Sequence, residues 1–260
     1  MNYSEFRHDV QIDSASQNPA IGAAPSAAEV KRRLDEFRKR RGYLMAHQGV
    51  MAAALPELQD AYGPFYKVLT LDPHHLTPLE REFVWLALLI AAREHIGTHH
   101  VDLFFKSGGT EAQAEAAFRL AAWSAGVSAY TFLDEHWQGH FPAVDAHCAY
   151  RDGVSALMDR CTEVTPTMAR LALVTVHTAR RDPWGVAAEI VACYSDGIPE
   201  VKVAEAMSLA LWPCGVNAFL AASEVWLALI REGKVQPSEP FRVWADTPGQ
   251  DGLDLPPRDG

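Results

Sequence analysis

Residues 76–100 read LTPLEREFVWLALLIAAREHIGTHH, and this stretch decides the fold. Thr77 and Glu80 form a capping box, in which each side chain can bond the backbone N–H of the other. Pro78 stands at the first helical position, where the missing N–H of proline costs least. The stretch that follows, residues 81–96, is nearly all apolar. It predicts a buried helix.

Other segments also predict helices. Ser26 and Glu29 form a second capping box, for a helix running to about Arg41, and Thr110 with Gln113 caps a helix running to Trp123. The chain holds 40 alanines, and alanine has the highest helix propensity. No segment alternates apolar and polar residues with period two. We therefore predict an all-α fold.

Composition excludes several classes of protein. The chain has 260 residues, a net charge of −10 and a pI near 5.5, so no net positive field would collect nucleic-acid phosphates. The longest apolar run, ten residues, is half of the roughly 20 that a membrane span needs. The N-terminus lacks the pattern of a signal peptide. Four scattered cysteines without a CxxC pair fit neither a disulfide scaffold nor a structural zinc site. We expect a cytoplasmic protein with neither nucleic acid nor membrane as a partner.

The chain is similar to itself at a shift of 89 residues. Residues 81–137 then fall on residues 170–226 without a gap, and twelve positions are identical, among them two glycines and two tryptophans. This pattern predicts two tandem repeats that bury each other's apolar faces around a pseudo-two-fold axis. At this shift Arg81 recurs as Arg170, which favours a structural ion-pair role, whereas Arg93 has no arginine counterpart.

The two copies differ in their ionisable residues. Residues 93–100 read REHIGTHH, and the matching residues 182–189 read DPWGVAAE. The first copy carries most of the groups that can bind acids or move protons. We therefore expect one functional site per chain, with residues of the second copy lining it.

At these residues the chain resembles the carboxymuconolactone decarboxylase family, which includes the alkylhydroperoxidase-like (AhpD-like) proteins. The resemblance rests on the Arg-Glu helix start at residues 81–82, on His100, and on the Gly followed by an acid-led helix at residues 108–111. It spans roughly residues 30–230. It implies an AhpD-like helical fold and a homo-oligomer, a trimer of two-repeat chains.

Peroxidase members of the family carry a Cys-x-x-Cys pair before the motif His. Arg93 and Ile96 occupy those places here, so thiol peroxidase chemistry of that kind is not expected. Glu82 and His100 persist. This combination favours the decarboxylase side: a lyase without cofactor or metal, acting on a small carboxylated lactone or a related intermediate of aromatic breakdown.

Such a decarboxylation needs an anchor for the acid, stabilisation of the carbanion, and a returned proton. Arginine and histidine supply these groups, and a carboxylate can orient a histidine. We predict as catalytic residues Glu82, Arg93, His95, His99 and His100. We predict as substrate-binding residues Glu94, His177, Arg181 and Trp184.

Two other functions stay open. His95 and His99, four apart if the segment is helical, could bind a metal in a hydrolase or isomerase. A non-catalytic ring protein that binds a small molecule is the third possibility. His100 could also be a hydrogen-bonded core residue.

We expect five segments: an N-terminal arm (1–25), leading helices with the first repeat (26–137), a linker (138–165), the second repeat (166–232) and a proline-rich tail (233–260). The linker favours a packed connection over a lid. The tail predicts disorder or an extended strap, with Phe241 and Trp244 as anchors.

Overall fold

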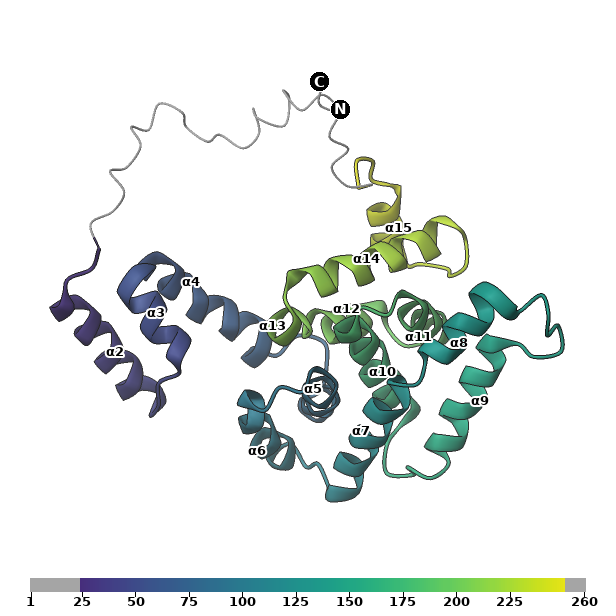
Figure 1. The fold of residues 1–260 in the computed structure, drawn as a ribbon, viewed down its shortest axis with the longest axis horizontal. Helices are drawn as coiled ribbons and strands as arrows, with labels where there is room; N and C mark the ends of the chain where they lie inside the picture. Colours follow the sequence, from purple (N-terminus) through teal and green to yellow (C-terminus); the bar gives the residue numbers. More distant parts are fainter. Residues whose placement is uncertain (1–23, 251–260) are drawn as a thin grey trace. The chain divides into compact units, whose positions relative to one another are not determined.

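The computed structural model describes residues 24–250, which form helices and contain no strand (Figure 1). The all-α prediction is therefore confirmed for the described part of the chain. Of the predicted N-terminal arm, residues 1–23 lie outside the described residues. The described residues divide into two compact units, residues 24–68 with 247–250, and residues 69–246. The predicted segment 26–137 spans that boundary.

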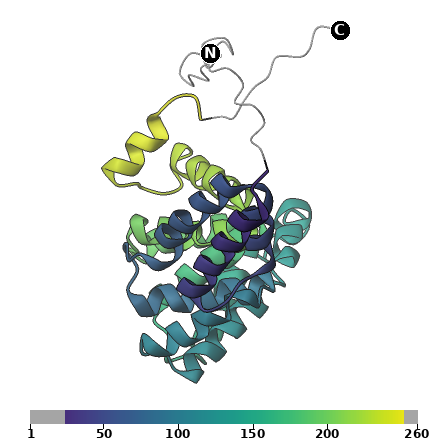
Figure 2. The same ribbon diagram turned by 90° about the vertical axis from the view of Figure 1, so that its left-hand side faces the viewer.

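The first unit holds three helices, α2 (Ala27–Arg41), α3 (Ala46–Ala54) and α4 (Pro56–Tyr66). Ser26 caps α2 by accepting a hydrogen bond from the backbone of Glu29, but the other half of the predicted capping box is replaced by ion pairs of Glu29 with Arg32 and Arg33. The α2 helix lies beside α3 in both ribbon views (Figures 1 and 2). Arg33 of α2 forms an ion pair with Asp60 of α4, with 2.8 Å between the charged atoms. Other basic residues of α2 pair with acids three or four positions away, which is typical of a solvated helix face.

The second unit holds the remaining helices. After a π-helical turn (η1, Lys67–Leu71) they are α5 (Pro78–Ala92), a 3₁₀ turn η2 (Ile96–Thr98), α6 (His99–Lys106), α7 (Glu111–Ser124), α8 (Ser128–Phe132), a π-helical turn η3 (Leu133–Trp137), α9 (Ala146–Met158), α10 (Pro166–Arg180), α11 (Pro183–Ser195), α12 (Glu200–Ser208), α13 (Leu211–Cys214), α14 (Val216–Arg231) and α15 (Glu239–Asp246).

Helices α5 and α10 pack against each other at the centre of the second unit (Figure 1). Each of these two helices contributes side chains to both apolar clusters of the second unit. On α5, Val84 and Leu88 enter one cluster, and Phe83 and Ala87 enter the other. A helix that is apolar on several faces must be buried, as the sequence of α5 predicted. Among the described helices, none has the length and apolar character to cross a membrane.

The ends of α5 and α10 match in detail. Thr77 and Glu80 form the predicted capping box of α5, and Thr165 caps α10. Each helix then ends at an arginine in the left-handed conformation, Arg93 at φ 56° and Arg181 at φ 54°. Other residues than glycine, asparagine and aspartate rarely adopt this conformation. These matching features lie 88 residues apart.

The segments that follow α5 and α10 show the same spacing of 88 residues, at Gly97 and Gly185. A Cβ on Gly97 would lie 2.7 Å from a methyl carbon of Leu89, and one on Gly185 would lie 2.3 Å from Nδ1 of His177. Gly108 and Gly197, further along, have positive φ and lie 89 residues apart.

The ungapped alignment of the chain with itself at a shift of 89 residues is therefore wrong by one residue for α5 and α10, whose ends match at a shift of 88 residues. At the spacing of their helix ends, Arg170 takes the position of Glu82 rather than that of Arg81. Arg181 takes the position of Arg93, so Arg93 does have an arginine counterpart.

Two elements, α5 and the tail, differ from their predictions, whereas the linker agrees with its prediction. The helix expected over 81–96 ends at Ala92, because Arg93 leaves the helical conformation. The linker contains α9, whose Tyr150 is fully buried, so it is a packed connection. In the tail, residues 239–246 form helix α15 rather than an extended strap. The anchoring role of Phe241 and Trp244 is confirmed, since their rings lie 4.9 and 5.9 Å from that of Trp226.

Gly153 tests how tightly α9 packs. A Cβ at this position would lie 2.2 Å from the ring of Trp123. Alanine favours a helix over glycine by about 1 kcal/mol, yet we expect Gly153→Ala to lower the free energy of unfolding by about 1–3 kcal/mol because of the overlap. Gly139, beside open space, is the control, and Gly139→Ala should stay within about 0.5 kcal/mol. Urea unfolding measures both; an unchanged Gly153→Ala would show that α9 can move away.

Candidate functional site

Glu82 and His100 form a buried pair. Their Oε2 and Nδ1 atoms lie 2.7 Å apart, and each side chain is 1% exposed. The ring of Trp85 stacks on the imidazole at 4.2 Å. Arg81 contacts the other carboxylate oxygen at 3.2 Å and also donates to backbone carbonyls. The sequence thus identified residues that meet in space, but the pair is shut away from solvent.

His99 and His95 lie in different surroundings. The His99 ring packs on His100, with 4.3 Å between ring centroids. His95 is exposed and precedes the 3₁₀ turn η2, so the two histidines do not share one face of a continuous α-helix. Within residues 24–250, no group of three or more His, Cys, Asp or Glu side chains could hold a metal ion. The arrangement gives the metal-assisted alternative no support.

An apolar hollow of about 440 Å³ opens between α5, α6 and α7. Its walls are almost entirely carbon. They comprise Leu86, Leu89, Ile90, Arg93, Glu94, His95, Thr98, Val101, Phe104, Phe105, Ala114 and Phe118. The hollow therefore suits a ligand with an apolar body.

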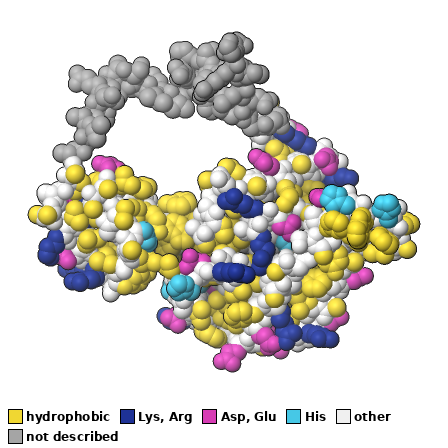
Figure 3. All heavy atoms as spheres, in the orientation of Figure 1, with side chains coloured by type: hydrophobic (Ala, Val, Ile, Leu, Met, Phe, Trp, Pro, Cys, Tyr) yellow, Lys and Arg dark blue, Asp and Glu magenta, His cyan; other side chains and the backbone are white. Residues whose placement is uncertain are grey.

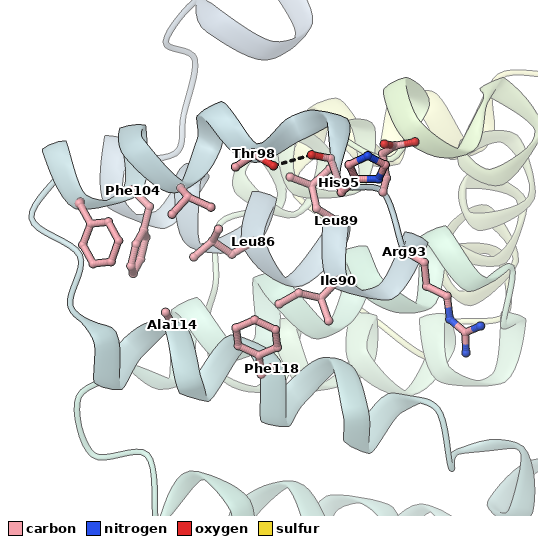
Figure 4. A pocket seen from close by; sticks show the side chains of 12 residues that line it. Leu86, Leu89, Ile90, Arg93, His95, Thr98, Phe104, Ala114 and Phe118 are labelled. Atoms are coloured by element: carbon pink, nitrogen blue, oxygen red, sulfur yellow. Dashed lines mark hydrogen bonds between the residues drawn. The ribbon is translucent and has the colours of Figure 1, made fainter.

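The polar groups of the apolar hollow come from the segment that follows α5. Figure 4 shows the Arg93 side chain extending away from the phenyl rings, and His95 beside Leu89. Arg93 makes no ion pair with any described residue. The Glu94 carboxylate accepts a hydrogen bond from the backbone of Ile96 at 2.7 Å. Arg93 and His95 are thus exposed and available to a ligand, unlike Glu82 and His100.

A second buried network links α9, α10 and α11. The Tyr150 hydroxyl donates to Glu189 at 2.6 Å and lies 3.1 Å from Nε2 of His177. Nδ1 of His177 lies 2.9 Å from an Asp182 oxygen. Arg170 contacts both Glu189 oxygens at 3.2 Å. Burial, followed by the Glu189 charge, raises the pKa of Tyr150.

Hydrogen counting assigns the protons of this network. Glu189 faces Arg170 as a carboxylate, so the single Tyr150 proton points to it. Nε2 of His177 must then donate to the Tyr150 oxygen, and Nδ1 must donate to the Asp182 carboxylate. Both nitrogens of His177 thus have a partner, the Tyr150 hydroxyl on one side and the Asp182 carboxylate on the other.

The residues predicted to bind substrate from the second copy do not line the apolar hollow. His177 belongs to the buried network. Trp184 donates to Asp134 at 2.8 Å and stacks on His147 at 4.6 Å. Arg181 lines a different hollow, described below. Of the predicted set, only Arg93, Glu94 and His95 share the apolar hollow.

Sequence reasoning missed Tyr150, Glu189 and Asp182 as members of a network. Tyr150 lies 27 residues from His177 and 39 from Glu189, so no local motif joins them. A usable signal was present in the comparison of the copies, because Glu189 is the residue that matches His100 at a shift of 89.

Tyr150 provides a test of the network. Tyr150→Phe keeps the ring and removes only the hydroxyl, which leaves Glu189 and His177 each without one hydrogen-bond partner. We expect the free energy of unfolding to fall by about 1–3 kcal/mol. Tyr130 makes ring contacts only, so Tyr130→Phe should change it by less than about 0.5 kcal/mol. Equal effects of the two substitutions in urea unfolding would contradict the network.

Asp182 gives the network a dependence on pH. Burial would raise the pKa of Asp182, but the hydrogen bond and charge of His177, with backbone N–H donors, lower it below its usual 3.8. The stabilising contribution is thus present above the unfolded-state pKa and is lost as pH falls through the folded one. Asp182→Asn should therefore flatten the loss of stability between about pH 5 and pH 2. Parallel acid unfolding curves for the two proteins would exclude this role.

Comparison with protein-family models, with curated proteins and with solved structures gives no match for this chain. The family resemblance of the sequence therefore remains an expectation. What the structure adds is the position of each candidate side chain.

Proposed function

We propose that the protein is a cofactor-independent decarboxylase that acts in the apolar hollow on a small carboxylated lactone or a related acid. One observation carries the proposal: a hollow of about 440 Å³ with carbon walls holds Arg93 and His95 in its lining. The resemblance to the carboxymuconolactone decarboxylase family supports the same class of reaction.

The reaction would follow from these groups. Loss of carbon dioxide breaks a carbon–carbon bond and leaves its electron pair on carbon, conjugated with the lactone carbonyl. Arg93 would hold the anionic oxygens of the substrate. His95 would return a proton to that carbon, and because His95 is exposed, solvent can replace the proton. Carbon walls solvate a carboxylate poorly, which favours release of uncharged carbon dioxide.

Glu82 and His100 take a different role in this proposal. They contact neither the hollow nor solvent, so they would act as positioning residues that fix α6 against α5. The proposal also includes descent from a tandem duplication, supported by the matching ends of α5 and α10. The proposal of a homotrimer rests on the family resemblance alone, and that of a cytoplasmic location rests on the composition.

A second candidate is a non-catalytic protein that binds a small apolar acid. The nearly all-carbon lining favours it, because few groups in the hollow can take part in chemistry. Binding without turnover would distinguish it from the enzyme.

The test measures carbon dioxide release from a panel of small carboxylated lactones. His95→Asn should lower kcat by about 100-fold or more through loss of the proton donor. Arg93→Asn should mainly raise KM, and asparagine tolerates the left-handed conformation of that position. Arg160→Gln removes an exposed arginine outside the hollow and is the control. A wild-type protein that binds the acids without turnover would be the binding protein; turnover unaffected by His95→Asn would remove His95 from the mechanism.

A further inference from the structure

A second hollow, of about 410 Å³, lies beside the end of α10 and is separate from the apolar hollow. We call it the arginine hollow. It is lined by Ser124, Ala125, Ser128, Thr131, Phe132, Glu135, His136, Arg180, Arg181, Asp182 and Pro183. Its lining combines two guanidinium groups with several hydroxyl groups, whereas the lining of the apolar hollow has one of each, from Arg93 and Thr98.

The two arginines have no carboxylate partner. Arg180 donates to the Ser124 hydroxyl at 3.1 Å and to the Ala121 carbonyl at 3.2 Å, both uncharged oxygens. Neither Arg180 nor Arg181 forms an ion pair with any residue between 24 and 250. Elsewhere in this unit, Arg170 and Arg81 both contact carboxylates. The cations of the arginine hollow are thus left for a ligand.

Of the two acids in the lining, Asp182 is engaged elsewhere and Glu135 pairs with neither arginine. Asp182 turns inward, where it accepts from His177 at 2.9 Å and from the Gly185 backbone at 3.1 Å. Glu135 has His136 as its neighbour at 3.8 Å. The Asp182 carboxylate, next to Arg181 in the sequence, therefore belongs to the buried network and does not pair with Arg181.

Further positive charge lies close by. Burial, and then the charge of Arg93, lower the pKa of Arg180, although Asp182 acts in the opposite direction. Like charges held together without a counter-ion repel each other, and a bound anion would relieve the repulsion.

A hydroxyl donor completes the set. Ser128 brings an exposed hydroxyl to the lining, whereas the Thr131 oxygen is buried out of reach of a ligand. Two guanidinium groups and a hydroxyl match the several acceptor oxygens of a phosphate group better than the two oxygens of one carboxylate.

We propose that the arginine hollow binds the phosphate group of a small phosphorylated molecule. Arg180 and Arg181 hold the phosphate oxygens, and the hydroxyl of Ser128 adds a hydrogen bond. This site stands apart from the proposed decarboxylase site and does not depend on it.

Calorimetric titration with phenyl phosphate tests the proposal on the full chain, with benzoate and sodium chloride of equal ionic strength as comparisons. Arg181→Asn removes the guanidinium, and asparagine tolerates its backbone conformation. We expect phenyl phosphate to bind the wild type, Arg181→Asn to weaken binding at least about tenfold, and the control Arg160→Gln to leave it unchanged. Circular dichroism confirms that each variant is folded.

Three results would overturn the proposal. They are no binding of phenyl phosphate, equal binding by wild type and Arg181→Asn, or benzoate binding as strong as that of phenyl phosphate. None of them bears on carbon dioxide release, so the two proposals can fail separately.

Discussion

Burial of charge on the two central helices is the constraint on which the second unit depends. Glu82 on α5 is buried and Arg170 at the matching position on α10 is half-buried, where an unpaired charge would be costly. Each therefore requires a partner from the helix that returns along it: His100 on α6 and Glu189 on α11. In the first pair the acid, Glu82, lies on the central helix. In the second pair the acid, Glu189, lies on the returning helix.

The return of the chain follows from the same packing. Arg93 and Arg181 take the left-handed conformation, which ends each central helix abruptly. Gly97 and Gly185 then let the chain pass close to its own helix, where a Cβ would overlap Leu89 or His177. Because the turns place arginine at both helix ends, each hollow gains a cation from the backbone geometry that closes the core. The first hollow has walls of carbon, and the second includes hydroxyl groups in its lining.

The sequence predicted what depends on local contacts and missed what depends on distant ones. The caps at Ser26, Thr77 and Thr110 were correct, because a cap involves only neighbours three residues apart. The end of α5 was predicted four residues late, since glycine is the usual signal and an arginine stands there. Glu82 and His100 were placed together by resemblance, but their enclosure could not be inferred, because burial depends on packing by the whole unit.

Arg93 and Arg180, which line different hollows, lie close enough for their charges to interact. An anion held in the arginine hollow would partly neutralise the field around Arg93 and so weaken its attraction for an acid in the apolar hollow. The strength of this coupling depends on how far the exposed guanidinium groups are screened by salt. The packing of α5 against α10 thus brings the cations of the two helix ends near each other.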